Sequence, residues 1–126
     1  LPDDHYGLAS SFGRHAIVRC DGRRQVRALT VVHELGHLLG AVHVSARASV
    51  MHPQVVFDGR FFDPLNRRIL SSSRDRRFGE PLSESTVRQL RAIYNAAARF
   101  PDEVDADDLA SLQAALERLA APQLSE

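Results

Sequence analysis

The pattern of apolar and polar positions divides the chain into a short strand-rich start and three helices. Two apolar-rich runs near the N-terminus, "YGLASSF" (6–12) and "HAIVR" (15–19), have the length and composition of strands. Gly13 and Arg14 between them match the length of a two-residue hairpin turn. The chain is therefore expected to begin with a β-hairpin.

Apolar residues recur at helical spacing over 25–39, which predicts the first helix. Gly40 follows the last of them and is typical of a helix end. The stretch 42–69 shows no helical period and is expected to be a loop. Within it, Asp-Gly between the apolar runs of "VVFDGRFF" (55–62) indicates a small hairpin.

The polar stretch 71–83 is rich in turn residues and predicts an exposed loop. Ser83 can cap a following helix that Pro101 ends, and Asp105 can cap a last helix that stops near Pro122. The apolar residues expected on the inner faces of these two helices are Val87, Leu90, Ile93, Tyr94, Ala97, Leu109, Leu112, Leu116 and Leu119.

Composition and charge narrow the class of protein. The 126 residues suit one domain, and 44% apolar with 25% charged residues is an ordinary globular balance. Sixteen basic residues offset sixteen acidic ones, so net charge favours neither nucleic acid nor membrane as a partner. A single cysteine excludes an internal disulfide framework and a thiolate zinc cluster. The start at Leu1, without Met, suggests a processed piece of a longer protein.

Three of the six histidines stand within "HELGHLLGAVH" (33–43). His33 and His37 are four residues apart, so on a helix they lie on one face and can both reach one zinc ion. Because glycine adopts a left-handed conformation without a Cβ clash, the chain can turn at Gly40 and bring His43 back as a third ligand. Three protein ligands leave a fourth position for water, which is the catalytic zinc arrangement.

Glu34 directly follows the first of these histidines and is expected to face the fourth position. Its carboxylate can take a proton from a zinc-bound water and later pass it to the leaving amine, while zinc polarises the carbonyl. A His-Glu-x-x-His pair alone also occurs by chance. Here the glycine, the third histidine and Met51 in "SVMHP" (49–53) are in place as well, which favours a zinc endopeptidase with Glu34 as general base and acid.

The motif HExxHxxGxxH followed by a methionine turn resembles the metzincin zinc endopeptidases, and within them the matrixins. The segment "LTVVHELGHLLG" (29–40) is also similar to its matrixin counterpart. The resemblance implies that Met51 forms an apolar floor under the three imidazoles and is not a ligand. It also implies that "YGLASSF" is the edge strand along which a peptide lies, and that "LSESTVRQLRAIY" (82–94) closes the lower subdomain.

Only 32 residues precede His33, far fewer than in a matrixin catalytic domain. The resemblance therefore predicts a truncated α+β metzincin-like domain with short N-terminal strands, an active-site helix, a methionine turn and C-terminal helices. Residues 1–100 would form the zinc-binding catalytic portion, and 101–126 an extra helix packed on it or on a partner. The resemblance further implies Zn²⁺ as cofactor, a peptide or protein substrate, a pro-segment or inhibitor as partner, and a secreted or periplasmic location.

Two alternatives remain open at this point. Endoribonucleases that mature ribosomal RNA carry a similar three-histidine pattern, HxxxHxxGxxH, in chains of like size. They usually lack a glutamate after the first histidine and a methionine turn, and a basic face would serve RNA binding. Glu34, Met51 and the balanced charge favour the protease. The second alternative is a catalytically inert zinc-binding module, which residue identities alone do not exclude.

Overall fold

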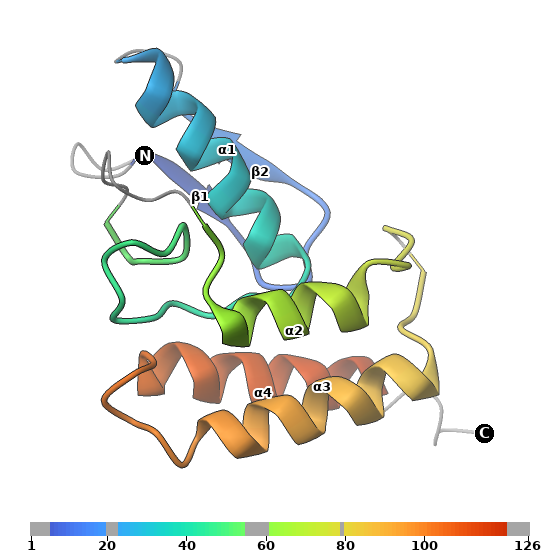
Figure 1. The fold of residues 1–126 in the computed structure, drawn as a ribbon. Coiled ribbons are helices and arrows are strands. Elements are labelled where there is room, and N and C mark those ends of the chain that lie inside the picture. Colours follow the sequence, from blue (N-terminus) through green and yellow to red (C-terminus); the bar gives the residue numbers. More distant parts are fainter. Residues whose placement is uncertain (1–5, 20–22, 55–60, 79, 121–126) are drawn as a thin grey trace.

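The computed structural model describes residues 6–19, 23–54, 61–78 and 80–120. Its elements are β1 (Gly7–Ala9), β2 (Ala16–Val18), α1 (Arg24–Leu38), α2 (Pro64–Ser73), α3 (Glu84–Ala97) and α4 (Ala106–Ala120). The small sheet packs on α1, and α2 lies between α1 and the antiparallel pair α3 and α4 (Figure 1). The predicted α+β class is confirmed for the described part of the chain, and its metzincin-like character stays a prediction.

The predicted hairpin is confirmed, but its strands are shorter and its loop is longer than expected. β1 and β2 pair antiparallel, with Leu8 opposite Ile17. The turn is not confined to Gly13 and Arg14, because residues 10–15 all lie between the strands. Within that loop Phe12 is buried and its N–H donates to the His37 carbonyl over 3.1 Å. Burial of this ring at the end of α1 draws the loop out of the sheet.

The first predicted helix is confirmed as α1, but only part of its apolar stripe is buried. Val32 and Leu35 lie on that stripe and remain 40% and 48% exposed. The side that faces the interior carries mainly polar and small residues. Its buried members are Val26, Thr30, His33, Glu34, Gly36, His37 and Leu38. The helix is therefore oriented so that its histidines face the interior, while Val32 and Leu35 remain on the outer side.

α2 contradicts the prediction that 42–69 and 71–83 are loops. Asp63 caps this helix by accepting from the Asn66 N–H over 3.1 Å, and Pro64 occupies the first helical position. Proline there already has a suitable φ and needs no N–H donor. The helix lacked a clear apolar period because two of its three fully buried positions, Asn66 and Ser73, are polar. The exposed loop begins only at Arg74, after the helix.

The two C-terminal helices agree with the prediction. The Ser83 hydroxyl accepts from the Thr86 N–H over 3.1 Å, and the Asp105 carboxylate accepts from the Asp108 N–H over 3.1 Å. The division of the chain at residue 100 stays a prediction, although α4 packs directly against α3. The small hairpin expected at 55–62 lies mostly outside the described residues, as does the predicted end near Pro122.

The main apolar core joins α2, α3 and α4 to the loop that follows α1. Its fully buried members, with side chains less than 2% exposed, are Ala41, Val42, Met51, Ile69, Leu90, Tyr94, Leu112 and Leu116. The core thus holds the loop containing residues 41–51 between α1 and the other helices.

No helix in the described ranges is long and apolar enough to cross a membrane.

Asn66 is the polar side chain at the centre of this core. It is fully buried, accepts from the Val42 N–H over 2.8 Å and donates to the Val42 carbonyl over 2.9 Å. The amide also donates to Asp63 Oδ1 over 2.8 Å. One side chain of α2 therefore satisfies both backbone groups of a loop residue, as a neighbouring strand would.

We expect Asn66→Ala to lower the free energy of unfolding by about 2–4 kcal/mol, since it leaves two buried backbone groups unpaired at roughly 1–3 kcal/mol each. Asn95, which is exposed and accepts from Gln113 over 3.1 Å, provides the matched control. Asn95→Ala should change the free energy by about 0.5 kcal/mol or less. Urea unfolding measures both, and equal losses in the two variants would contradict the role assigned to Asn66.

Candidate metal centre

α1 and the loop after it bring the three predicted histidines together. The Nε2 atoms of His33 and His37 are 3.1 Å apart, and the Nε2 of His43 lies 3.2 Å from the first and 3.0 Å from the second. His33 and His37 are buried, whereas the His43 side chain is 25% exposed. The cluster could hold a metal ion, and it reaches solvent on the His43 side.

The backbone determines which nitrogen of each buried ring faces the cluster. The Nδ1 of His33 lies 2.7 Å from the Val50 carbonyl, and that of His37 lies 3.3 Å from the Ala41 carbonyl. A carbonyl only accepts, so both Nδ1 atoms carry the proton in the neutral rings and both Nε2 atoms present lone pairs. The close Nε2 contact between these two rings is therefore not a hydrogen bond but a pair of facing lone pairs, which a cation would satisfy.

Burial keeps both of these rings neutral. Burial is the largest cause that lowers the pKa of His33 from 6.5 to about 4, and repulsion from His43 and His52 lowers it further. The hydrogen bond that His33 donates to the Val50 carbonyl acts in the opposite direction and raises this pKa. Burial likewise lowers the pKa of His37 to about 3, with repulsion from His33 and His43. Neutral imidazole is the form that binds metals, so protons compete weakly for these two nitrogens.

Gly40 has the conformation that the sequence predicts for it. Its φ is +91°, and a Cβ there would lie 2.6 Å from the Tyr94 hydroxyl oxygen and 2.7 Å from the Phe12 ring. The Tyr94 hydroxyl donates to the Gly40 carbonyl over 2.6 Å. Glycine is thus required both for the backbone turn and for the close approach of two aromatic rings, and the turn leads the chain back to His43.

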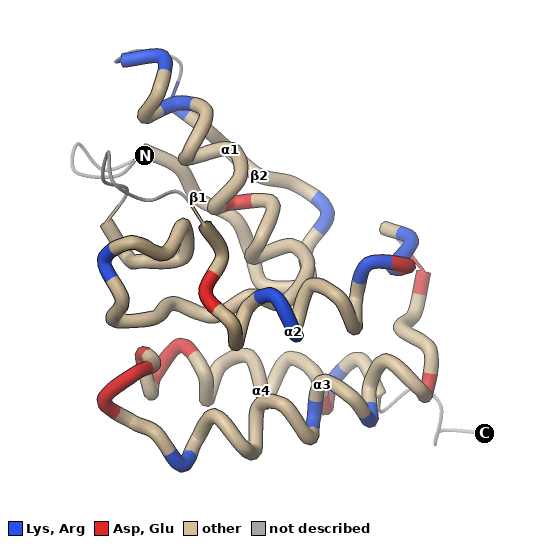
Figure 2. The backbone as a smooth tube through the Cα atoms, viewed as in Figure 1, with Lys and Arg blue, Asp and Glu red and all other residues tan. Residues whose placement is uncertain are grey.

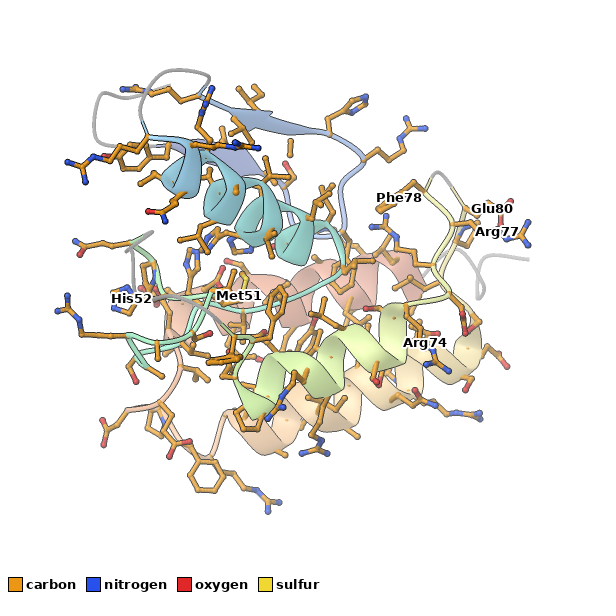
Figure 3. All side chains as sticks on the ribbon, turned by 45° about the horizontal axis from the view of Figure 1, so that its top comes forward. Met51, His52, Arg74, Arg77, Phe78 and Glu80 are labelled. Carbon is orange, nitrogen blue, oxygen red and sulfur yellow. The ribbon has the colours of Figure 1, made fainter. Side chains whose placement is uncertain are left out.

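Met51 packs against α1 at the helix position between the two buried histidines. The side chain is fully buried, and a Cβ on Gly36 would lie 2.8 Å from its sulfur. The Met51 carbonyl accepts from the Val44 N–H over 3.2 Å, which closes the loop between them. Figure 3 shows Met51 beneath α1 and His52, the next residue, further toward the edge of the molecule.

Glu34 lies beside the cluster, 5% exposed, with Oε1 3.9 Å from the Nε2 of His33. β1 crosses directly over it, because a Cβ on Gly7 would lie 2.9 Å from the Glu34 Cγ and 2.7 Å from the Thr30 methyl carbon. Gly7 was not singled out from the sequence, since its role depends on how closely the sheet approaches α1. The structure thus places a shielded carboxylate next to the three nitrogens.

Asp108 is a further residue that the sequence analysis did not assign to the site. Acidic residues gather at the turn between α3 and α4 and on the first turn of α4 (Figure 2). Asp108 Oδ2 accepts from the His43 N–H over 2.7 Å and lies 3.8 Å from the His43 Nδ1. The only sequence signal was an acid three residues after the capping Asp105, which indicates a helix start and not a contact with a distant loop.

Comparison with known proteins does not assign the chain to a family: no family model matches it, and neither does any curated protein or solved structure. The geometry of the three histidines therefore defines a candidate metal centre, and the metal and the reaction are matters for proposal.

A double-mutant cycle tests the packing of Met51. We expect Gly36→Ala to lower the free energy of unfolding by about 1–3 kcal/mol, because the added Cβ would lie 2.8 Å from the buried Met51 sulfur and the thioether would have to shift within the core. In the Met51→Ala background the same change should be neutral or stabilising, since alanine is favoured over glycine in helices by about 1 kcal/mol. Urea unfolding of the four proteins measures the coupling. Equal costs in both backgrounds would mean that the sulfur does not lie against Gly36.

The pKa values of His33 and His37 predict how the metal-free protein responds to acid. Both pKa values are lower in the folded state than the unperturbed 6.5, so the unfolded chain binds more protons once the pH falls below 6.5. Stability is therefore present above pH 6.5 and is lost as pH falls toward 4, at about 1.4 kcal/mol per pH unit for each ring.

Urea unfolding in excess chelator between pH 7 and pH 5 measures this slope. His15→Gln, which changes an exposed histidine, is the control and should leave the slope as it is. A free energy of unfolding that stays constant over this pH range would show that the two rings do not become protonated on unfolding, contrary to the expected linkage.

Proposed function

We propose that this protein is a zinc-dependent endopeptidase of metzincin, matrixin-like type. The observation that carries the proposal is the convergence of three Nε2 atoms, 3.0–3.2 Å apart, beside a buried carboxylate. The sequence motif contains the residue types of a zinc endopeptidase site, and their placement on one helix and one returning loop supports this interpretation. Glu34 is the proposed general base and acid, and His33, His37 and His43 are the proposed ligands.

The donor set fits zinc. Bonds of about 2.0–2.1 Å at tetrahedral angles place ligand nitrogens roughly 3.3–3.4 Å apart, slightly more than the separations in the cluster. Three neutral imidazoles suit this borderline-soft ion, and two of them are oriented by backbone carbonyls, as ligating histidines usually are. Bound there, zinc would supply Lewis acidity toward a peptide carbonyl and toward water. Met51 supports the ligands by packing against α1 at Gly36.

Glu34 carries the proton-transfer part of the mechanism. Its carboxylate accepts a proton from water as the water oxygen bonds to the scissile carbonyl carbon. It then returns that proton to the nitrogen as the carbon–nitrogen bond breaks. Shielding by β1 at Gly7 and by α1 limits access of bulk water to the carboxylate, which strengthens its interactions with nearby charge. The 3.9 Å distance to His33 keeps it within reach of a group held at the cluster.

The proposed substrate is an extended peptide. β1 pairs with β2 along one edge, and within the described residues its other edge carries no strand. An extended peptide can add to such an edge through backbone hydrogen bonds. Since β1 crosses over Glu34 at Gly7, a peptide along this edge would pass close to the proposed catalytic carboxylate.

Glu34→Gln tests the proposal most directly. The change keeps the side-chain shape and leaves the three histidines in place, so zinc content should remain near one per chain. Cleavage of quenched peptides or casein should fall by on the order of 10²-fold or more, the usual contribution of a positioned general base. Glu80→Gln is the matched control, because this exposed residue lies at the edge of the molecule opposite His52 and away from Met51 (Figure 3).

The outcomes separate the candidate functions. Chelator should abolish peptide cleavage in the wild type and in Glu80→Gln alike. A protein that binds zinc but cleaves no peptide would favour an inert zinc-binding module instead. Cleavage at the wild-type rate by Glu34→Gln would assign proton transfer to another residue.

A further inference from the structure

The third histidine is held differently from the other two. His33 and His37 project from a regular helix, so their backbone positions follow from α1 itself. His43 lies in the loop after Gly40, outside any helix or strand, so its backbone position depends on tertiary contacts. Its N–H donates to Asp108 Oδ2 over 2.7 Å, and its carbonyl accepts from the Asp105 N–H over 3.0 Å. Both partners come from the start of α4, more than sixty residues away in the chain.

The neighbouring residues extend this attachment. Val44 forms an isolated antiparallel bridge with Val104. The Ser45 N–H donates to the Glu103 carbonyl over 3.0 Å. The segment that carries the third histidine is therefore paired along its length with the segment that begins α4, which fixes the position of the Asp108 carboxylate relative to the ring.

The same carboxylate lies beside the outer nitrogen of the ring. The Nε2 of His43 points toward the other two histidines, so its Nδ1 points away from them, and Asp108 Oδ2 is 3.8 Å from this Nδ1. In the other two rings the corresponding Nδ1 atoms face the carbonyls of Val50 and Ala41. A carboxylate in this place would orient the His43 ring as a ligand, because an anion beside Nδ1 stabilises the Nδ1–H and leaves the lone pair on Nε2.

The surroundings hold the Asp108 carboxylate in place. It lies in the first turn of α4, where the helix dipole favours an anion, and its own N–H donates to Asp105. Burial and then the nearby charge of Asp108 raise the pKa of Tyr94, whose hydroxyl stays protonated and donates to the Gly40 carbonyl. The carboxylate thus lies against the His43 backbone and close enough to Tyr94, the partner of the Gly40 carbonyl, to act on it electrostatically.

We propose that Asp108 is a positioning residue of the metal centre, which anchors the backbone of the third ligand and accepts the Nδ1–H of the His43 ring when Nε2 binds the metal. This inference rests on the metal-binding half of the proposed function and not on peptide hydrolysis. A ring rotation that shortens the 3.8 Å separation by roughly 1 Å would give a charge-assisted hydrogen bond of usual length. α4 then becomes part of the metal centre.

Zinc affinity of the full chain, measured by competition with a chromophoric chelator, tests the proposal. Asp108→Ala should raise the zinc dissociation constant about 10–100-fold, the usual effect of removing a group that orients a ligand. Asp108→Asn keeps an oxygen for the His43 N–H, so the Tm of its metal-free form should stay near that of the wild type. It removes the negative charge at Nδ1, so its dissociation constant should still rise about tenfold.

Asp107→Asn is the matched control, because Asp107 is an exposed acid in the same helical turn. It removes the same charge from the same region and should leave the dissociation constant within about twofold of the wild type, since an exposed charge acts weakly at this range. An equal loss in Asp107→Asn and Asp108→Asn would reduce the effect to general electrostatics and overturn the proposal.

The other possible outcomes also test the role of Asp108. Asp108→Asn that binds zinc as tightly as the wild type would make Asp108 a backbone anchor only and overturn the role at the ring. A wild type that binds no zinc would overturn the metal centre together with this inference. A third outcome is that the wild type binds zinc without cleaving peptides, while Asp108→Asn binds zinc more weakly. That result would support the positioning role of Asp108 and contradict the proposed endopeptidase activity.

Discussion

The backbone between Leu38 and His43 leaves a helix, reverses direction and stays largely buried, so its polar groups need partners. The N–H groups of residues 39–41 donate to carbonyls of α1, but most of the carbonyls and the later N–H groups find no partner in that helix. The later helices and the segment after α2 provide them with side chains. Those pairs are Arg76 with the Leu38 carbonyl, Ser73 with the Leu39 carbonyl, Tyr94 with the Gly40 carbonyl, Asn66 with both groups of Val42, and Asp108 with the His43 N–H. The third histidine therefore reaches the other two only if α2, α3 and α4 have packed around this segment.

This dependence explains why polar residues occupy central positions in a small protein. Asn66 is fully buried at the position where a larger apolar residue would fill the core, and α1 turns its histidines inward while Val32 and Leu35 remain exposed. Burial also disfavours protonation of two adjacent imidazoles and brings their lone pairs within 3.1 Å of each other. Residues that lower stability, such as buried polar side chains, are expected where a functional site requires them. A cation bound between the imidazoles would remove the repulsion between their lone pairs.

The elements that the sequence predicted correctly are those with strong local signals. α3 and α4 combine regular apolar spacing with Ser83 and Asp105 as caps, and Gly40 ends α1. α2 was missed because its buried face includes Asn66 and Ser73, which apolar spacing does not count. Asp63 followed by Pro64 is a typical helix start, but the prediction relied on apolar periodicity, which this segment lacks.

The same distinction between local signals and tertiary packing applies to the candidate site. The sequence by itself determined that His33 and His37 share a helix face and that Gly40 can turn the chain, because helical spacing and glycine stereochemistry act over a few residues. Only the tertiary structure decided how close His43 comes to the others and that Asp108 holds it. It also decided that Gly36 makes room for Met51 and that Gly7 lets β1 pass over Glu34. These contacts join segments whose separation in the chain carries no periodic signal, so they follow from the packing of the helices and the sheet and not from local sequence pattern.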